Sequence, residues 1–319
     1  MNRLSKGSVS WEEIDESADG QRIDNFLVKI LKGVPRSHVY RILRSGEVRV
    51  NSGRVGARYR LETGDRVRIP PVRLAIRETP RPGNRPSDRI ALSQNPLFED
   101  ESLLAIDKPS GVAVHGGSGV SMGVIERLRS ELPNQRFLEL VHRLDRDTSG
   151  VLLLAKKRSA LTALHSQLRE GTIEKRYQVL VPGDWPNKRQ KVRLRLHKYV
   201  TGEGERRVAV DEEGADAYTI FNLVKRLGAF SLLEAELKTG RTHQIRVHLA
   251  HLGFPIAGDD KYGDFPANKI LAKQGLKRMF LHAKSMMFRH PGSGDTVTIE
   301  APLPQDLAQF LESRHVLAR

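Results

Sequence analysis

The stretch best equipped for chemistry is residues 142–150, His-Arg-Leu-Asp-Arg-Asp-Thr-Ser-Gly, which places Asp145 between two arginines. An aspartate with an ordinary pKa of about 3.9 is already ionised at neutral pH, so Asp145 needs compensation for lost water rather than activation of its charge. The apolar run at residues 151–155 predicts a buried strand directly after it, and a loop that leads into the core is held rigidly. We therefore expect the chemistry at Asp145. An acid among arginines also fits a solvated cluster of surface ion pairs, which is the alternative.

Three further stretches bring together residue types found in active sites. Residues 108–112 read Lys-Pro-Ser-Gly-Val, and residues 239–248 read Thr-Gly-Arg-Thr-His-Gln-Ile-Arg-Val-His around Arg246. Between them, Arg176 and Tyr177 open an expected strand. A tyrosine in a strand commonly does no more than pack in the core.

Histidines and acids near the third stretch raise the hypothesis of a metal site. The set comprises His243, His248, His251, Asp259 and Asp260. Its spacing matches no zinc-protease pattern, and helical geometry places His243 and His248 on different faces. We expect no metal.

Two short apolar periods predict a small N-terminal domain over residues 20–73. From Ile23 the apolar positions recur at i, i+3, i+4, i+7 and i+8, which makes one apolar helix face. A second helix follows from residue 35, where a proline suits the first turn. Short strands are expected at residues 48–50 and 66–69.

Arginines lie away from the apolar stripe of the second expected helix. Arg36 is at its exposed start, while Arg41 and Arg44 fall on the opposite side at about 100° per residue. The pattern resembles the S4 RNA-binding domain, which implies that Arg36, Arg41 and Arg44 bind RNA. The matching stretches are residues 21–27, 45–51 and 64–67. A helical dimerisation module with a solvated basic face is the alternative.

Composition sets the other boundaries. Residues 1–19 are polar and aperiodic, which predicts a mobile tail. Residues 74–96 are rich in proline and arginine, so they predict a locally stiff linker that cannot form a core. Residues 97–319 mix helices and strands without regular βαβ alternation. That mixture predicts an α+β fold with a mixed, mostly antiparallel central sheet.

The charge balance indicates a polyanionic partner. Among 319 residues, 53 Lys and Arg against 38 Asp and Glu give a formal charge of +15 and a pI near 10.2. Nucleic acid fits better than a membrane, because no long apolar segment or basic amphipathic helix accompanies the charge. The lack of cysteine excludes disulfide scaffolds and zinc–thiolate sites. The first residues lack the apolar core of a secretory signal, so we expect a cytoplasmic monomer without a membrane partner.

Taken in order, the motifs resemble the RluA-type pseudouridine synthases over residues 99–302. The pair formed by residues 142–150 and 240–248 is specific, since either stretch alone could arise by chance. The resemblance implies isomerisation of uridine to pseudouridine, with 23S ribosomal RNA as the substrate. The glycosidic bond breaks, the base turns, and C5 joins the ribose. Such a reaction involves no redox change and no group donor, so no cofactor is expected.

The resemblance assigns three catalytic residues. Asp145 would be the carboxylate, acting either as a nucleophile at C1′ or as a base at C2′. Arg246 would fix its direction through a charge-assisted hydrogen bond. At about 4 Å and an effective dielectric near 20, this attraction is roughly 4 kcal/mol before desolvation. Tyr177 would stack on the base near C5.

The resemblance also assigns RNA contacts around the carboxylate. Leu281 would form an apolar wall under the uracil. Arg143 would fill the space left by a uridine pulled from its stack, or else bind a phosphate. His142 is the neighbouring substrate contact, and residues 108–111 would support the site from behind.

Two other classes of protein remain as alternatives. A non-catalytic RNA-binding protein of ribosome assembly would use the larger domain only to clamp RNA. A glycosidase would need a second carboxylate, for which Asp147 is the candidate. Within the favoured class, the same reaction at other uridines of 23S ribosomal RNA is a further alternative.

Overall fold

The computed structural model describes residues 9–31, 34–72, 91–116 and 122–317. The chain divides into two compact units, Met1–Arg81 and Pro82–Arg319. Most of the expected linker at residues 74–96 lies outside the described residues, and residues 91–96 form turns and bends.

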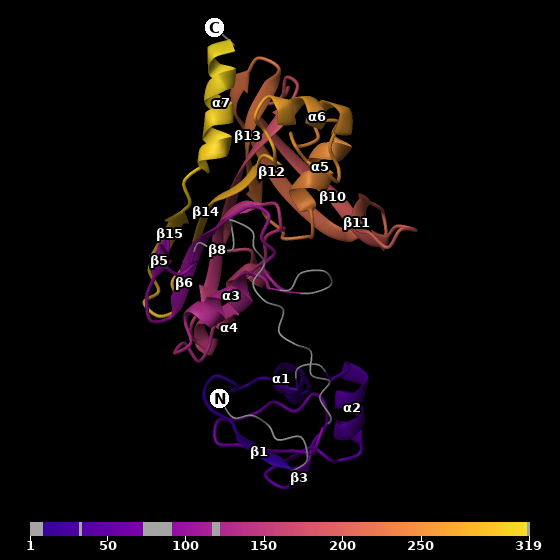
Figure 1. Cartoon of the computed structure of the whole chain (residues 1–319), viewed down its shortest axis with the longest axis vertical. Helices are drawn as coiled ribbons and strands as arrows, with labels where there is room; N and C mark the ends of the chain where they lie inside the picture. The colour runs from indigo at the N-terminus through magenta and orange to yellow at the C-terminus, as the bar shows by residue number, and fades with distance from the viewer. Residues whose placement is uncertain (1–8, 32–33, 73–90, 117–121, 318–319) are drawn as a thin grey trace. The chain divides into compact units, whose positions relative to one another are not determined.

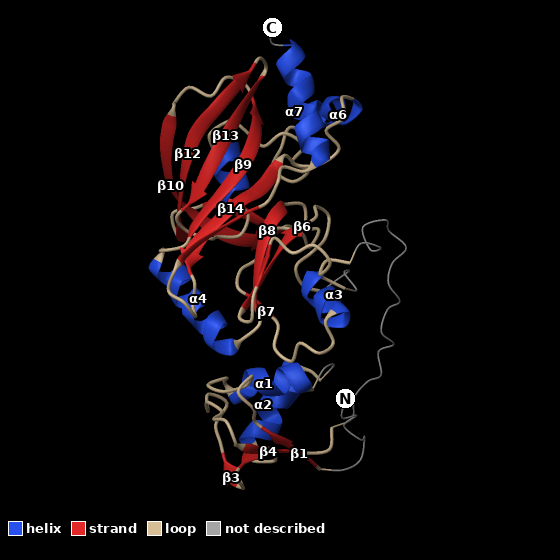
Figure 2. Ribbon diagram, turned by 90° about the vertical axis from the view of Figure 1, so that its left-hand side faces the viewer, coloured by secondary structure: helices blue, strands red, loops and turns tan. Residues whose placement is uncertain are grey.

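Within the described residues, the first unit is an antiparallel sheet, ordered β1-β4-β2-β3, and two helices that lie together on one side of it (Figure 2). Ile23 and Leu27 of the first helix meet Val39 and Ile42 of the second in one apolar cluster, as their spacing predicts. The elements are β1 (Ser10–Glu13), α1 (Ile23–Ile30), α2 (Arg36–Arg44), β2 (Arg49–Val50), β3 (Gly53–Arg54) and β4 (Arg66–Ile69).

The prediction of a mobile tail over residues 1–19 is wrong for its second half. Strand β1 pairs antiparallel with β4, from Ser10 opposite Ile69 to Glu13 opposite Arg66. Ile14 is buried directly after the strand. The sequence hides this strand because backbone hydrogen bonds hold an edge strand, and its side chains Ser-Trp-Glu-Glu show no apolar alternation.

The second unit is built on one large sheet (Figure 1). Its strand order is β11-β10-β12-β13-β9-β14-β8-β6-β5, with β15 beside β14 and β7 beside β8. Its strands are β5 (Phe98–Glu99), β6 (Leu103–Lys108), β7 (Glu139–Leu140), β8 (Ser149–Ala155), β9 (Glu174–Pro182), β10 (Arg189–Val200), β11 (Arg206–Val210), β12 (Ala215–Leu227), β13 (Phe230–Leu237), β14 (Leu281–Arg289) and β15 (Thr296–Glu300). Its helices are α3 (Val124–Glu131), α4 (Arg158–Glu170), α5 (Gln244–His251), α6 (Phe265–Lys273) and α7 (Gln305–Leu317). The α+β fold with a mostly antiparallel sheet is confirmed.

Strand β8 is covered on both faces, which explains its apolar sequence. Leu152 and Leu154 lie in one core cluster with residues of α3, while Val151 and Leu153 lie in another with residues of α4. Every residue of the strand is buried. The loop before β8, which carries Asp145, is therefore anchored in the centre of the unit.

Parallel pairing of β8 with β14 joins the two parts of the sheet, and the other strand pairs of the described residues are antiparallel. At this junction Gly150 lies opposite Ala283. Its φ is +110°, and a Cβ on it would be 2.2 Å from the carbonyl oxygen of Ala283. Only glycine allows the two backbones to approach this closely.

We predict that Gly150→Ala lowers the free energy of unfolding by about 3 kcal/mol or more, because backbone strain adds to a steric clash. Gly171→Ala is the matched control, since Gly171 also has a positive φ, +73°, but open space around it. It should cost only about 1–2 kcal/mol. Urea unfolding measures both, and equal losses would contradict the importance of the β8–β14 approach.

Candidate active site

A cleft of about 940 Å³ lies in the second unit, between the loop before β8, strand β9 and the start of α5. It gathers stretches that are far apart in the sequence: residues 139–145, 165–171 and 237–246, with Tyr177 and Leu281. All six site residues expected in this unit line the cleft. They are His142, Arg143, Asp145, Tyr177, Arg246 and Leu281.

The segment after β6 holds the Asp145 loop from behind. The Gly111 N–H donates to the Arg146 carbonyl at 2.8 Å, and the Ser110 hydroxyl donates to the Asp147 carbonyl at 2.7 Å. The backbone carbonyls of the two residues that follow Asp145 are thereby fixed. The supporting position expected for residues 108–111 agrees with these contacts.

Lys108 strengthens this support from the core. Its buried Nζ donates to the carbonyls of Pro109 and Val112 at 2.8 Å and to that of Arg146 at 3.0 Å. Burial lowers the pKa of Lys108 to about 7, and the nearby carboxylates of Asp147 and Asp145 oppose the shift. Three carbonyl acceptors match the three N–H donors of an ammonium group, so the hydrogen bonds favour the charged form.

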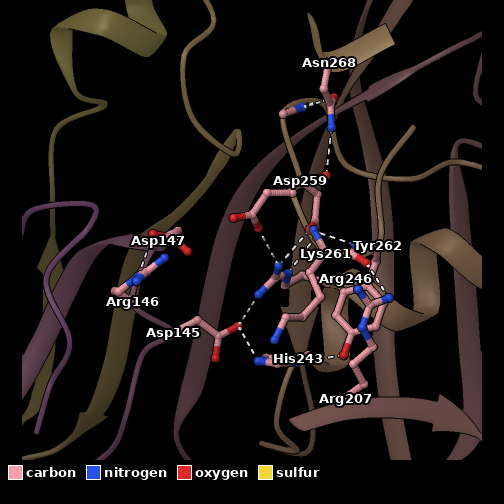
Figure 3. Close-up of polar contacts among 12 residues, drawn as sticks. Asp145, Arg146, Asp147, Arg207, His243, Arg246, Asp259, Lys261, Tyr262 and Asn268 are labelled. Carbon is pink, nitrogen blue, oxygen red and sulfur yellow. Dashed lines mark hydrogen bonds and ion pairs between the residues drawn. The ribbon is translucent and has the colours of Figure 1, made fainter. Parts of the chain in front are cut away.

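Arg246 links the Asp145 loop to a carboxylate of the core (Figure 3). Its Nη1 donates to Oδ2 of Asp145 at 3.4 Å. Its Nε and Nη2 form a bidentate pair with Asp259, at 2.7 Å each. The Arg246 side chain is 4% exposed and that of Asp259 is 0% exposed, whereas Asp145 is 27% exposed at the cleft. The guanidinium is thus fixed by Asp259 and directed at Asp145, whose carboxylate is more exposed than the dehydrated acid we expected.

The Asp259 carboxylate has enough partners to remain ionised without water. Besides Arg246, its Oδ1 accepts from the backbone N–H groups of Lys261 and Tyr262 at 2.8 and 3.0 Å. Burial opposes the charge, but these hydrogen bonds and the guanidinium outweigh it and lower the pKa of Asp259. Burial likewise opposes the charge on Arg246, and the two carboxylates outweigh it and raise the Arg246 pKa. Both groups are therefore charged throughout the physiological pH range.

His243 is a second neighbour of Asp145, with Nε2 at 4.0 Å from Oδ2. Its backbone has a φ of +53°, which is uncommon for a residue other than glycine. Its Nδ1 lies 2.8 Å from the Tyr262 hydroxyl, which accepts from the Val208 N–H. The described residues offer that hydroxyl proton no other acceptor, so Tyr262 donates to Nδ1. Because burial lowers the His243 pKa, we assign a neutral ring with its proton on Nε2, toward Asp145.

Tyr177 and Leu281 form an apolar part of the cleft. Tyr177 is on β9 and Leu281 opens β14, and both are largely buried. Burial and the nearby charge of Asp145 raise the pKa of Tyr177 above its ordinary value. The Tyr177 side chain is therefore a neutral phenol at physiological pH.

The two residues before Leu144 have different surroundings. Arg143 is exposed at the cleft. His142 is half-buried, and its Nε2 accepts from the Leu153 N–H at 3.1 Å. Burial lowers the His142 pKa to about 4, which keeps this nitrogen free of a proton. One side of the His142 ring is thus engaged by β8 and not available to RNA.

Arg36, Arg41 and Arg44 belong to the first unit and are not among the residues of the cleft. All three are exposed on α2, as expected. In the described ranges, no group of three or more histidines and acids is arranged to hold a metal ion. Every helix of those ranges is too short or too polar to cross a bilayer.

Sequence reasoning missed two residues of the site, Asp259 and His243. Both were considered only as possible metal ligands. Their residue types gave a signal, since an acid and a histidine near a polar motif need partners. Nothing in the spacing showed that Asp259, 13 positions after Arg246, would pair with that guanidinium.

Comparisons with known proteins agree with this geometry. The family described as RNA pseudouridylate synthase matches residues 102–251, and the S4 domain matches residues 21–67. Ribosomal large subunit pseudouridine synthase C from Salmonella typhi is 54% identical over 307 residues, covering 96% of each chain. The protein of that name from Pasteurella multocida is 52% identical over 304 residues, covering 95% of this chain and 93% of its own.

The chain belongs to the RNA pseudouridylate synthase family. It is an enzyme that isomerises uridine in RNA to pseudouridine, and it carries an S4 domain.

Solved structures of the family share the fold. Human RNA pseudouridylate synthase domain containing 4 superposes with a TM-score of 0.58 at 23% identity, over 71% of this chain and 94% of its own. The human domain containing 1 protein gives a TM-score of 0.55 at 22% identity, over 70% and 96%.

We predict that Asp259→Asn lowers the free energy of unfolding by about 3–5 kcal/mol, because it leaves a buried guanidinium without its charged partner. Loss of the fixed direction toward Asp145 should also lower kcat by about 10- to 100-fold. Asp260→Asn is the matched control, since Asp260 is 71% exposed and 3.6 Å from the same Arg246. Unfolding curves and single-turnover rates compare the two variants. Equal losses in Asp259→Asn and Asp260→Asn would show that Asp259 only balances the charge of Arg246.

A pH dependence is expected from His248, a buried residue of α5. Neither of its ring nitrogens has a hydrogen-bond partner among the described residues, and burial, with His251 nearby, lowers its pKa to about 4. The unfolded chain then binds the proton more tightly, so stability is complete above about pH 6.5 and is lost as pH falls toward 4. The loss attributable to His248 is about 3 kcal/mol.

Urea unfolding at neutral pH and near pH 4 measures this contribution. The variant His248→Leu should lose less stability than the wild type over the same interval. An identical loss in both proteins would assign the acid sensitivity to other groups.

Proposed function

We propose that this enzyme isomerises uridines of 23S ribosomal RNA, with Asp145 as the catalytic carboxylate. The observation that supports the assignment best is the Asp145 side chain at the cleft, held at 3.4 Å by a guanidinium that a second carboxylate fixes. The names of the relatives, which refer to the large ribosomal subunit, support the choice of RNA. The RNA partner would be met during assembly of that subunit, by a cytoplasmic monomer.

The geometry suits Asp145 to approach a ribose. Both contacts to its carboxylate, from Arg246 and His243, are made at Oδ2. Within the described residues Oδ1 has no such contact, so it is the oxygen available to the substrate. It could attack C1′ or remove a proton at C2′, and both routes break the bond between N1 and C1′.

The apolar part of the cleft suits a uracil that must turn without leaving. Tyr177 would stack on the base and Leu281 would lie under it, so that the freed base stays out of bulk water. When C5 joins C1′, the proton on C5 is lost and N1 gains one. No redox change accompanies the isomerisation. Tyr177, a neutral phenol, lies beside the base in this arrangement.

Cations would bring the RNA into position. Arg143, exposed at the cleft, would take the place of the extruded uridine, with His142 behind it. Arg36, Arg41 and Arg44 would bind RNA through the S4 domain, in a proposed layout of residues 20–73 for that domain, 74–96 for the linker and 97–319 for the catalytic domain.

We predict that Asp145→Ala abolishes pseudouridine formation in an unmodified 23S RNA transcript while the dissociation constant changes by less than about threefold, or about 0.7 kcal/mol. The matched control is Asp147→Ala, which removes a neighbouring acid of similar exposure, 28% against 27%. This control should keep its turnover.

Mapping pseudouridine along the transcript, with binding measured in parallel, tests the assignment. Turnover by Asp145→Ala would remove the carboxylate from its role. Wild-type protein that modifies no uridine of 23S RNA would overturn the proposed substrate, and released uracil would favour the hydrolytic alternative that uses Asp147.

A further inference from the structure

The sheet face turned away from the cleft carries a row of cations. Residues that lie opposite each other in neighbouring strands share a face, and the register places Tyr177, Ala235, Phe221 and Gln190 on the cleft face. The alternate residues of β10 therefore point to the other face. We call four of them the basic row: Arg189, Lys191, Arg193 and Arg195.

Every member of the basic row is exposed, while the alternate positions of β10 pack inward. Val192 and Leu196 are buried in apolar clusters on the cleft side. An antiparallel sheet with one wet face is expected to show such alternation. Alternation alone does not require that all four outward positions between residues 189 and 195 be cationic, because solvated surfaces ordinarily mix both signs.

Acids compensate the basic row only in part. Arg195 pairs with Asp216 at 3.2 Å, and Arg189 lies 4.0 Å from Glu236. Glu236 is shared, since it also pairs with Lys238. The remaining two cations form no ion pair with a carboxylate of the described residues.

Those two cations are Lys191 and Arg193. Arg193 lies over the ring of Tyr218, with 4.3 Å between its guanidinium carbon and the ring centroid. Stacking of this kind holds the guanidinium plane while its N–H groups remain free for a planar or tetrahedral anion. Arg193 is thus positioned but not neutralised.

The basic row continues to the edge of the cleft. Arg241 lines the cleft, and its Nε donates at 3.0 Å to the backbone carbonyl of Asp216, the residue that pairs with Arg195. Lys238 also lines the cleft and shares Glu236 with Arg189. A polyanion that leaves the cleft over these two side chains meets the basic row next.

The spacing of the row suits a chain of phosphates. Alternate residues of a strand are about 6.6 Å apart, so the span from Arg189 to Arg195 is roughly 20 Å. This repeat is comparable to that of phosphates along an extended RNA strand, which bind lysine and arginine without regard to base sequence.

We infer that the basic row is a second RNA-binding surface of the catalytic domain, which holds the strand flanking the uridine in the cleft. The inference rests on the proposed function, because the same RNA molecule must occupy both places. The row supplies affinity and register, while the cleft carries out the isomerisation.

The test compares Lys191→Gln/Arg193→Gln with Lys269→Gln/Lys273→Gln, in the full chain. The control pair removes the same charge from exposed positions of α6. Two probes are used: an unmodified 23S RNA transcript, and a short uridine-containing oligoribonucleotide that can fill the cleft but not reach the row. Dissociation constants are measured over a series of salt concentrations, and thermal unfolding verifies that the variants fold.

For the basic-row variant, affinity for the transcript should fall about tenfold near 0.1 M salt. The slope of log K against log salt should become shallower by about 1.4 to 1.8, at about 0.7 to 0.9 per lost phosphate contact. Binding of the short oligonucleotide should not change. At saturating transcript kcat should be that of the wild type, with a raised KM, and the control pair should resemble the wild type on both probes.

Several results would overturn the basic row as an RNA surface. These are an unchanged salt slope, an equal loss in the control pair, or an equal loss on the short oligonucleotide. A different result would overturn the proposed function: wild-type protein that binds the transcript but isomerises none of its uridines. The salt slopes measured on the same samples would still test whether the basic row binds RNA.

Discussion

The buried pair of Arg246 and Asp259 is the constraint on which the site depends. Removing both charges from water costs several kcal/mol per ion, and only good geometry with further hydrogen bonds compensates for it. Asp259 meets that condition through a bidentate contact and two backbone N–H groups. The pair contributes little net stability by this reasoning, but it directs Nη1 of the guanidinium toward Asp145. Its effect is to fix the direction of the guanidinium that holds the Asp145 carboxylate.

The rest of the second unit serves to bring Asp145 to that guanidinium. Asp145 precedes a strand buried on both faces, and Arg246 is carried by a helix about a hundred residues later. Close approach of β8 and β14 at Gly150 joins the two parts of the sheet. Lys108 and Ser110 hold the loop from the other side. These contacts support the Asp145 loop rigidly from several directions.

The cations of the second unit fall into two groups, buried ones that bind protein acceptors and exposed ones that face solvent. In the second unit Arg246 and Lys108 are buried and hydrogen-bonded to protein acceptors, whereas Arg143 is exposed at the cleft. The basic row on β10 is exposed and only partly compensated. Exposed cations attract a polyanion over long range and lose strength with salt, while buried ones act only on their immediate neighbours. A single value of net charge conceals this division.

The sequence by itself determined the reaction class, the two-domain α+β organisation and the place of Asp145, because specific motifs and apolar periods are local properties of the chain. It also placed Arg246 beside Asp145 through the family motif. The sequence did not predict strand β1, because backbone pairing holds that strand and its side chains show no apolar alternation. Only the tertiary structure decided that Asp259 fixes Arg246, that His243 adjoins Asp145, and that alternate cations of β10 share one open face. The physical reason is that ion pairs and shared faces depend on distances between segments, which spacing along the chain does not encode.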